Sequence, residues 1–331
     1  MRYIAITVSS LALAGCFYAC TRTEQISTSP PAKTSFAISA TTEAVLVEVA
    51  EVKGFFKQEG LEITRRLHPY GMRALQDVLA GKADFATAAE TPVMFAILSG
   101  ERISIIATIE SSTRGNAVTA RKDHGILALH DLRGKRLAVT PGTISEFFLD
   151  SLLSVNGISR NEINIVSLPS ETMPDALASG NIDAASTFNP YTSQAQKKLG
   201  GRGITFENEN IYTWTFNVIA KQDYVAKNPG IVNKVLRALV KAEEFVSNNA
   251  AEAQQIAADF TGMDISVIRS AWSDIRFGIT LDQSLILSLE DESRWAIHNK
   301  LTKARTVPNY LNYIYLDGLL AVKPQAVRIL R

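Results

Sequence analysis

Residues 79–86 read LAGKADFA, and residues 178–185 read ASGNIDAA. In each stretch a helix-like segment ends at a glycine, an aspartate follows three residues later, and a short strand of small apolar residues begins. Gly81 and Gly180 suit the left-handed conformation in which many helices end, and we expect Asp84 and Asp183 to bond to amides of their own turns. Because the two units stand 99 residues apart in similar surroundings, they predict two similar α/β lobes.

Segments with strand and helix patterns alternate around these units, which indicates doubly wound, parallel α/β structure. The expected strands cover 36–39, 61–67, 83–86, 103–109, 117–120, 136–140, 163–168, 182–187 and 218–220. The expected helices between them cover 44–56, 72–80, 93–99, 146–155 and 172–179. After Pro229 the pattern becomes helical, at 231–247, 250–260, 266–277, 283–297 and 308–311, and we expect this tail to pack on the first lobe.

The composition is that of an ordinary globular protein, with 46% hydrophobic and 20% charged residues and a net charge of +1. No basic stripe is available for nucleic acid. The only cysteines are Cys16 and Cys20, so the globular part has neither a disulfide nor a thiolate metal site. The four histidines show no metal-pair spacing, and we expect no metal and no cofactor.

The first fifteen residues have the order of a secretory signal peptide: Arg2, a short apolar run, and the small residues Ala14 and Gly15. Cys16 follows directly, as in the bacterial lipoprotein box, and we expect it to carry a lipid. An ordinary signal peptide and a buried N-terminal strand are the alternatives, and Cys20 is a weaker candidate for cleavage. Residues 21–35 are polar and contain Pro30 and Pro31, and they predict a flexible tether over 16–35, with a strand that caps the domain as the alternative.

Four short blocks carry a family resemblance. Residues 50–61 read AEVKGFFKQEGL, residues 80–85 read AGKADF, and residues 131–136 read DLRGKR before the Gly-Thr pair at 142–143. Residues 189–191 read NPY, with Asn where the family often has Glu. Together these blocks resemble the substrate-binding proteins of nitrate, sulfonate, taurine and thiamine-pyrimidine importers. The resemblance covers most of residues 36–250 and does not specify the ligand.

The resemblance implies a type II periplasmic binding fold, in which two α/β lobes joined by two crossover segments hold a ligand between them. It places lobe 1 at 36–116 and 217–331 and lobe 2 at 117–216, with hinges near 114–120 and 212–220. It also implies a monomer whose ligand-closed form is recognised by an ABC importer, so that a lipid anchor would keep the protein near its permease.

Ligands in open α/β sheets bind beyond the carboxyl ends of the strands. This rule and the second crossover nominate Thr41, Thr42, Glu43, Tyr70, Gly71, Glu90, Thr91, Gly142, Thr143, Ser145, Glu146, Asn189, Tyr191, Tyr212 and Trp214 as ligand-binding residues.

The nominated set combines helix N-termini, which favour anions, with three glutamates, which repel them. Each of Glu43, Glu90 and Glu146 either caps its own helix or points into the cleft. If one points inward, the ligand must carry nitrogen donors, so we favour a zwitterion or a nitrogenous ring over a bare anion. Tyr70, Tyr191, Tyr212, Trp214 and Phe188 either stack on a flat ligand or belong to the core.

The sequence therefore predicts an extracytoplasmic, lipid-anchored solute-binding protein that is not an enzyme. A fungal enzyme of thiamine-pyrimidine synthesis shares the blocks but needs a cysteine cluster, which the globular part lacks. The alternative is a tethered sensor or partner-docking lipoprotein without a role in transport.

Overall fold

The structure, a computed structural model, describes residues 30–330. The expectations about the leader, Cys16, Cys20 and the tether up to residue 29 concern residues outside this range. No helix among the described residues is both long and apolar enough to cross a membrane.

Two mixed β-sheets organise the described chain, and the strands run in the order β12-β11-β4-β10-β3-β1-β2 in one and β7-β6-β8-β5-β9 in the other. The strands of the first sheet are β1 (Ala32–Ser39), β2 (Leu61–His68), β3 (Phe85–Ala89), β4 (Ile103–Ser112), β10 (Trp214–Lys221), β11 (Ile275–Asp282) and β12 (Val327–Arg328). Those of the second are β5 (Asn116–Arg121), β6 (Arg136–Val139), β7 (Asn164–Ser167), β8 (Ala184–Phe188) and β9 (Gly203–Phe206). This is the predicted α/β fold with two lobes, although β4, β5, β9, β10 and β11 form antiparallel pairs.

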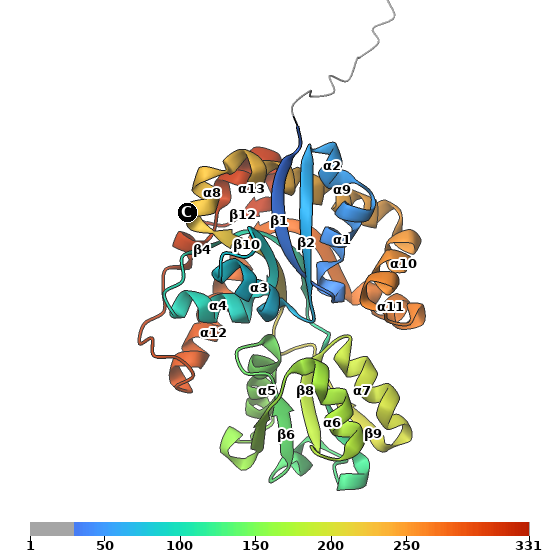
Figure 1. Cartoon of the computed structure of the whole chain (residues 1–331). Helices are drawn as coiled ribbons and strands as arrows, with labels where there is room; N and C mark the ends of the chain where they lie inside the picture. Colours follow the sequence, from blue (N-terminus) through green and yellow to red (C-terminus); the bar gives the residue numbers. More distant parts are fainter. Residues whose placement is uncertain (1–29, 331) are drawn as a thin grey trace, which may run out of the picture. The chain divides into compact units, whose positions relative to one another are not determined.

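Helices cover both faces of the first sheet (Figure 1). Alternate residues of β1 explain the two layers: Phe36 and Ile38 join the large core cluster with α1, whereas Ala37 packs with Ala74 and Val78 of α3. The helices of this lobe are α1 (Val45–Val52), α2 (Phe55–Gln58), α3 (Gly71–Leu79), α4 (Glu90–Leu98), α8 (Gln222–Lys227), α9 (Pro229–Asn248), α10 (Ala250–Thr261), α11 (Ile265–Ala271), α12 (Gln283–His298) and α13 (Leu316–Val322).

The C-terminal helices pack on the first lobe, as predicted. Helix α9 contacts α1 and α2, α10 contacts α1, and α12 contacts α4. In Figure 1 the orange helices α9 and α10 accordingly lie beside the blue helix α1. These helices share the large apolar core cluster with α1, so the helical tail packs on the first lobe.

The second sheet is also covered on both faces, by α5 (Ile144–Val155) on one side and by α6 (Met173–Ser179) and α7 (Tyr191–Leu199) on the other. Leu137 and Val139 of β6 pack with α5, while Ala138 between them packs with α6 and α7. The period of two along a strand therefore builds two small cores rather than one.

The chain passes from the first sheet to the second between Ser112 and Asn116, and returns between Phe206 and Trp214. Trp214–Phe216, which the sequence analysis placed in lobe 2, therefore belong to β10 of the first sheet, and Asn116 belongs to β5 of the second. The outgoing crossover leaves the end of β4, and the returning crossover enters the start of β10. Because Trp214 of β10 pairs with Ser112 of β4, these two ends are neighbours in the sheet.

Four predicted segments differ from the structure. Residues 32–35, assigned to the tether, form the first half of β1, because their backbone pairs in register with Leu61–Thr64 of β2. The helix expected over 44–56 is split into α1 and α2 at Gly54, whose φ of 70° is left-handed. The helix expected over 266–277 ends at Ala271 and gives way to β11 at Ile275. The last segment, expected at 308–311, is a single 3-10 turn at Tyr310–Tyr313.

The repeated glycine–aspartate units are both present, with left-handed φ angles of 70° at Gly81 and 80° at Gly180. The aspartates, however, bond to a neighbouring strand rather than to their own turns. Asp84 accepts hydrogen bonds from the amide and hydroxyl of Ser35, both at 2.8 Å. Asp183 accepts from the Arg136 amide at 2.8 Å and from its guanidinium at 2.7 Å, and this guanidinium holds the pKa of Asp183 well below its usual range.

Candidate functional site

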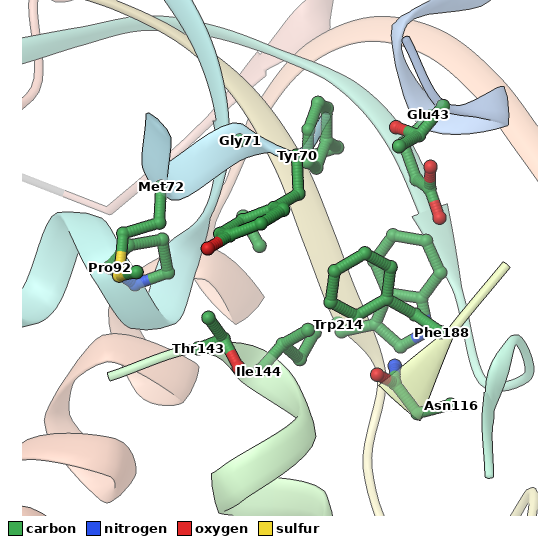
Figure 2. Close-up of a pocket in the computed structure, with 13 residues that line it drawn as sticks. Glu43, Tyr70, Gly71, Met72, Pro92, Asn116, Thr143, Ile144, Phe188 and Trp214 are labelled. Carbon is green, nitrogen blue, oxygen red and sulfur yellow. The ribbon is translucent and has the colours of Figure 1, made fainter. Parts of the chain in front are cut away.

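A cavity lies where strand ends of both lobes and the crossovers meet, and about 420 Å³ of space free of protein atoms, open solvent included, lies within its lining. Figure 2 shows Glu43 and Tyr70 from the first lobe and Thr143, Ile144 and Phe188 from the second around this space. Its lining consists of Thr41, Glu43, Tyr70, Gly71, Met72, Ala89, Pro92, Asn116, Thr143, Ile144, Phe188, Trp214 and Phe216.

The wall from the first lobe depends on close packing at the start of α3. A Cβ atom on Gly71 would lie only 2.8 Å from the Ala88 Cα atom, so only glycine allows α3 to approach β3 this closely. Tyr70 precedes it and is buried, and its hydroxyl accepts a hydrogen bond from the Arg73 Nε atom at 3.2 Å. The phenol ring therefore has a fixed place in the wall.

The wall from the second lobe is formed by the turn before α5 and by the end of β8. The Thr143 hydroxyl donates to the Thr140 carbonyl at 2.7 Å and lies 2.8 Å from the Ser145 hydroxyl. Phe188 meets Tyr70 of the first lobe edge-on, with ring centroids 6.2 Å apart. Aromatic rings of both lobes thus border the same space and can hold a flat ligand.

Trp214 stands at the crossover and its ring is buried. The indole Nε1–H donates to the Arg114 carbonyl at 2.7 Å, so the returning crossover is tied to the outgoing one. The polar edge of the indole is used by this bond, which leaves its apolar surface for the cavity.

Glu43 is the predicted glutamate that reaches the cavity. It is 7% exposed, and its Oε2 atom has no hydrogen-bond partner among the described residues. Burial raises the pKa of this carboxyl above its ordinary value, against hydrogen bonds from Thr41 and Thr42 that lower it. An unpartnered buried carboxyl is costly, so this atom is available to a ligand.

Glu90 and Thr91 lie outside the cavity lining, in a buried polar network beneath it. Glu90 accepts hydrogen bonds from the Thr215 amide at 2.8 Å and hydroxyl at 3.1 Å, and Thr91 donates to Glu292 at 2.8 Å. The Glu90 and Glu292 carboxyls are neighbours in this network, and the Glu90 Oε1 and Glu292 Oε2 atoms have no hydrogen-bond partner among the described residues. Burial raises the pKa of Glu90 to about 7 and that of Glu292 well above its ordinary value. Glu90 thus positions Thr215, which stands between two lining residues.

Gly142, Ser145 and Glu146 also lie behind the lining. Glu146 accepts from the Gly142 amide at 2.8 Å and pairs with Arg160 at 2.7 Å, so its charge is neutralised inside the second lobe. The Ser145 carbonyl accepts from the Ser186 hydroxyl at 2.8 Å. These three residues shape the turn that presents Thr143.

The remaining nominated residues are divided among other places. Thr42 and Asn189 line a second cavity beside the first. The Tyr191 hydroxyl donates to the Pro69 carbonyl at 2.9 Å and joins the two lobes. Tyr212 packs edge-on against Phe147 at 4.9 Å, and proximity to Glu90 and Glu292 adds to burial in raising the pKa of its hydroxyl. Tyr191 and Tyr212 line neither of these two cavities.

The structure adds lining residues that sequence reasoning missed. Met72, Pro92 and Ile144 stand in the first turns of nominated helices, so the rule for strand ends had already indicated their place. Asn116 and Phe216 lie at or near the start of β5 and β10, the two strands that directly follow the crossovers. Among residues 30–330 no group of three His, Cys, Asp or Glu side chains is placed to hold a metal ion.

Comparison with known proteins gives a consistent result. The NMT1/THI5-like family model matches residues 41–253. A Brucella abortus protein named as a binding protein is 25% identical over 66% of this chain and 68% of its own. A Bacillus subtilis protein named as an aliphatic sulfonates-binding protein is 24% identical over 67% of this chain and 68% of its own.

Solved structures share the fold at lower identity. The alkanesulfonate-binding protein SsuA of Xanthomonas axonopodis pv. citri, solved with bound MOPS, has a TM-score of 0.74 at 18% identity and covers 87% of this chain and 99% of its own. The desulfurization enzyme DSZB has a TM-score of 0.63 at 14% identity and covers 89% of this chain and 99% of its own. The same fold therefore occurs in binding proteins and in an enzyme.

Proposed function

The chain belongs to the NMT1/THI5-like family, and on that premise we propose that it is an extracytoplasmic solute-binding protein that delivers a small organic ligand to an ABC importer. The observation that carries this proposal is the cavity lined from both lobes and both crossovers. A ligand that contacts both walls stabilises the arrangement in which they face each other, because it binds that arrangement better than a separated one.

The lining of the cavity favours a binding protein over an enzyme. The polar side chains around the cavity are two threonines, one asparagine and Glu43, and the other side chains are apolar or aromatic. No histidine, cysteine or lysine lines this cavity, so the lining offers no strong nucleophile beside the Glu43 carboxyl. Such a lining orients a ligand more readily than it transforms one.

The ligand that we propose is a zwitterion or a nitrogenous ring. Some relatives are named as sulfonate-binding proteins. In this chain, however, Glu43 presents an unpartnered carboxyl oxygen to the cavity, and no arginine or lysine lines it. A nitrogen donor would satisfy that oxygen, whereas a bare anion would be repelled by it.

Ligand capture is tested by native mass spectrometry of the gently purified full chain, followed by identification of any molecule released on denaturation. We expect one small nitrogenous molecule per chain. Trp214→Ala should weaken rebinding of this molecule at least tenfold without changing the fold, since the indole surface borders the cavity. An empty protein that shows no thermal shift with any of a panel of amines, amino acids, sulfonates and nitrate would contradict the proposal.

We also propose that Cys16 carries a lipid and anchors the protein, as its position after Leu-Ala-Gly indicates. Incorporation of a labelled fatty acid in a bacterial host measures this directly. Cys16→Ser should abolish the label, while Cys20→Ser, the matched control, should retain it. Label that follows Cys20 instead would move the processing site.

A tethered sensor without a role in transport is the second candidate function, and uptake separates the two. Deletion of the gene should abolish import of the released molecule into cells, and the wild-type chain should restore it. Normal uptake in the deletion strain would favour the sensor.

A further inference from the structure

A second cavity adjoins the first and extends it toward α11. About 1000 Å³ of space free of protein atoms, open solvent included, lies within its lining, and it shares Glu43, Trp214 and no other residue with the first lining. Because Glu43 and the indole of Trp214 border both spaces, one molecule can occupy the first cavity and reach into the second.

The lining of the second cavity is acidic. Glu43, Glu110, Glu207 and Asp274 supply four carboxylates, and Arg114 supplies the one guanidinium of this lining. Arg114 is already paired, with Glu209 and, at 3.8 Å, with Asp274. The lining therefore contains no positively charged side chain that could neutralise Glu43 and Glu110.

Glu110 lines the second cavity, although the sequence did not nominate it as a ligand-binding residue. It lies near the end of β4, where it pairs with Phe216 of β10 and Phe277 of β11, and it is 1% exposed. Its Oε2 atom has no hydrogen-bond partner among the described residues, as is also true of the Glu43 Oε2 atom. Two buried, unpartnered carboxyl oxygens that line one cavity constitute the unsatisfied part of the site.

The two carboxyls also influence each other. Burial raises the pKa of Glu110 well above its ordinary value, and the nearby charge of Glu43 raises it further. Neither group can ionise cheaply while the cavity holds no cation, because two like charges face each other in a site of low polarity. A cation with at least two N–H donors removes both costs, since it neutralises the charge and satisfies both oxygens.

We infer that Glu43 and Glu110 bind a protonated nitrogen group of the ligand, an ammonium or amidinium, while its flat unsaturated part occupies the first cavity between Tyr70, Phe188 and Trp214. The inference rests on the proposed function, which it deepens by naming the ligand as an organic cation. It assigns to Glu110 a direct role in binding.

Three probes of similar size separate the possible ligand classes: benzamidine, which is a cation, benzamide, which is neutral, and benzenesulfonate, which is an anion. Their binding to the purified full chain is measured by ligand-observed NMR titration at pH 8. Benzamidine should bind at least tenfold more tightly than the other two. Glu43→Gln and Glu110→Gln should each weaken benzamidine at least tenfold, whereas Glu244→Gln, which removes the same charge from an exposed position on α9, should change nothing.

A pH series adds a result that a merely structural role would not produce. Benzamidine keeps its charge between pH 5 and pH 8, so any change in its affinity reports on the protein. Affinity should rise with pH as Glu43 and Glu110 ionise, and the double Gln variant should show a flat profile. The thermal unfolding midpoint of each variant confirms that it is folded.

Several results would overturn the inference. Benzenesulfonate binding that equals or exceeds benzamidine binding, or benzamidine binding unchanged by both Gln variants, would remove the cation site and leave the proposed function standing. A released native molecule without a basic nitrogen would do the same. Failure of all three probes at millimolar concentration would also overturn it, and native mass spectrometry then decides separately whether the protein captures a ligand at all.

Discussion

Glu43 in the first lobe and Glu146 in the second occupy comparable places, since each lies in the first helical turn after a strand of its sheet. Both are buried, at 7% and 3% exposure. Glu146 pairs with Arg160 at 2.7 Å and accepts the Gly142 amide at 2.8 Å, whereas Glu43 keeps one oxygen without a partner. Burial therefore does not distinguish these two carboxylates, while the presence of a matched cation does.

Glu90 is intermediate between these two. It occupies the first turn of α4 and accepts hydrogen bonds from Thr215, while its charged neighbour is a second carboxyl, Glu292, rather than a cation. The Glu90 Oε1 atom, like the Glu43 Oε2 atom, has no hydrogen-bond partner among the described residues. Burial raises the pKa of both Glu90 and Glu292, which favours the protonated form of the pair. Of the three glutamates, Glu146 alone therefore has a matched cation.

The largest effect is expected from removing Arg160, the cation that pairs with Glu146 in the second lobe. Arg160→Ala would leave Glu146 buried without its ion pair and would also remove the partner of Asp150. Breaking a buried pair in this way costs about 3 kcal/mol of unfolding free energy. Urea unfolding of the variant and the wild type measures the difference.

Arg133→Ala is the matched control, because its pair with Glu162 is exposed on both sides. It should cost less than about 1 kcal/mol. A similar loss in both variants would mean that Glu146 does not depend on its guanidinium partner, and the contrast with Glu43 would then disappear.

The sequence patterns predicted which helices and strands are present more accurately than where each of them begins and ends. Strand and helix alternation depends on neighbouring residues, so β6, α5 and α9 lie where their periodicity indicated. The strand β11 was missed although Ile275, Phe277, Ile279 and Leu281 alternate with less buried residues, since the helical pattern before it was extended too far. Its strand state is set by pairing with β4, which lies more than 160 residues earlier in the sequence.

The partners of the site residues were beyond local reasoning. Arg160 follows Glu146 by 14 residues, and Glu292 follows Glu90 by about 200, so only the fold brings each pair together. Glu110 was missed because the strand containing it was expected to end at Ile109. A single carboxylate at the end of an otherwise apolar strand, next to a crossover, was the signal that could have identified it.

The carboxyl pair beneath the cavity predicts a pH effect on stability. Because burial raises the pKa of Glu90 from 4.5 to about 7, the folded state holds more protons than the unfolded state in this range. Its contribution to stability is therefore complete below about pH 4.5 and is lost as pH rises to about 7. The loss is on the order of 3 kcal/mol.

Unfolding free energies measured from pH 4 to pH 8 test this effect. The double variant Glu90→Gln/Glu292→Gln should lose less stability across the range than the wild type, whereas Glu244→Gln should follow the wild-type curve. Parallel curves for the wild type and the double variant would show that the pair holds no extra proton.

The smallest effect is expected at Glu43, and its sign is opposite to that at Arg160. Burial raises the pKa of Glu43, so its contribution to stability falls as pH rises. Glu43→Gln should therefore stabilise the empty protein by about 1 kcal/mol at pH 8 and have little effect at pH 4, since the amide keeps the shape without the charge. Glu146→Gln, by contrast, should destabilise it by about 1 kcal/mol, because Arg160 would lose a charged partner. If Glu43→Gln is more stable at pH 8 and also binds benzamidine less tightly, one carboxylate lowers stability and supports binding, as expected for a group that receives its partner from the ligand.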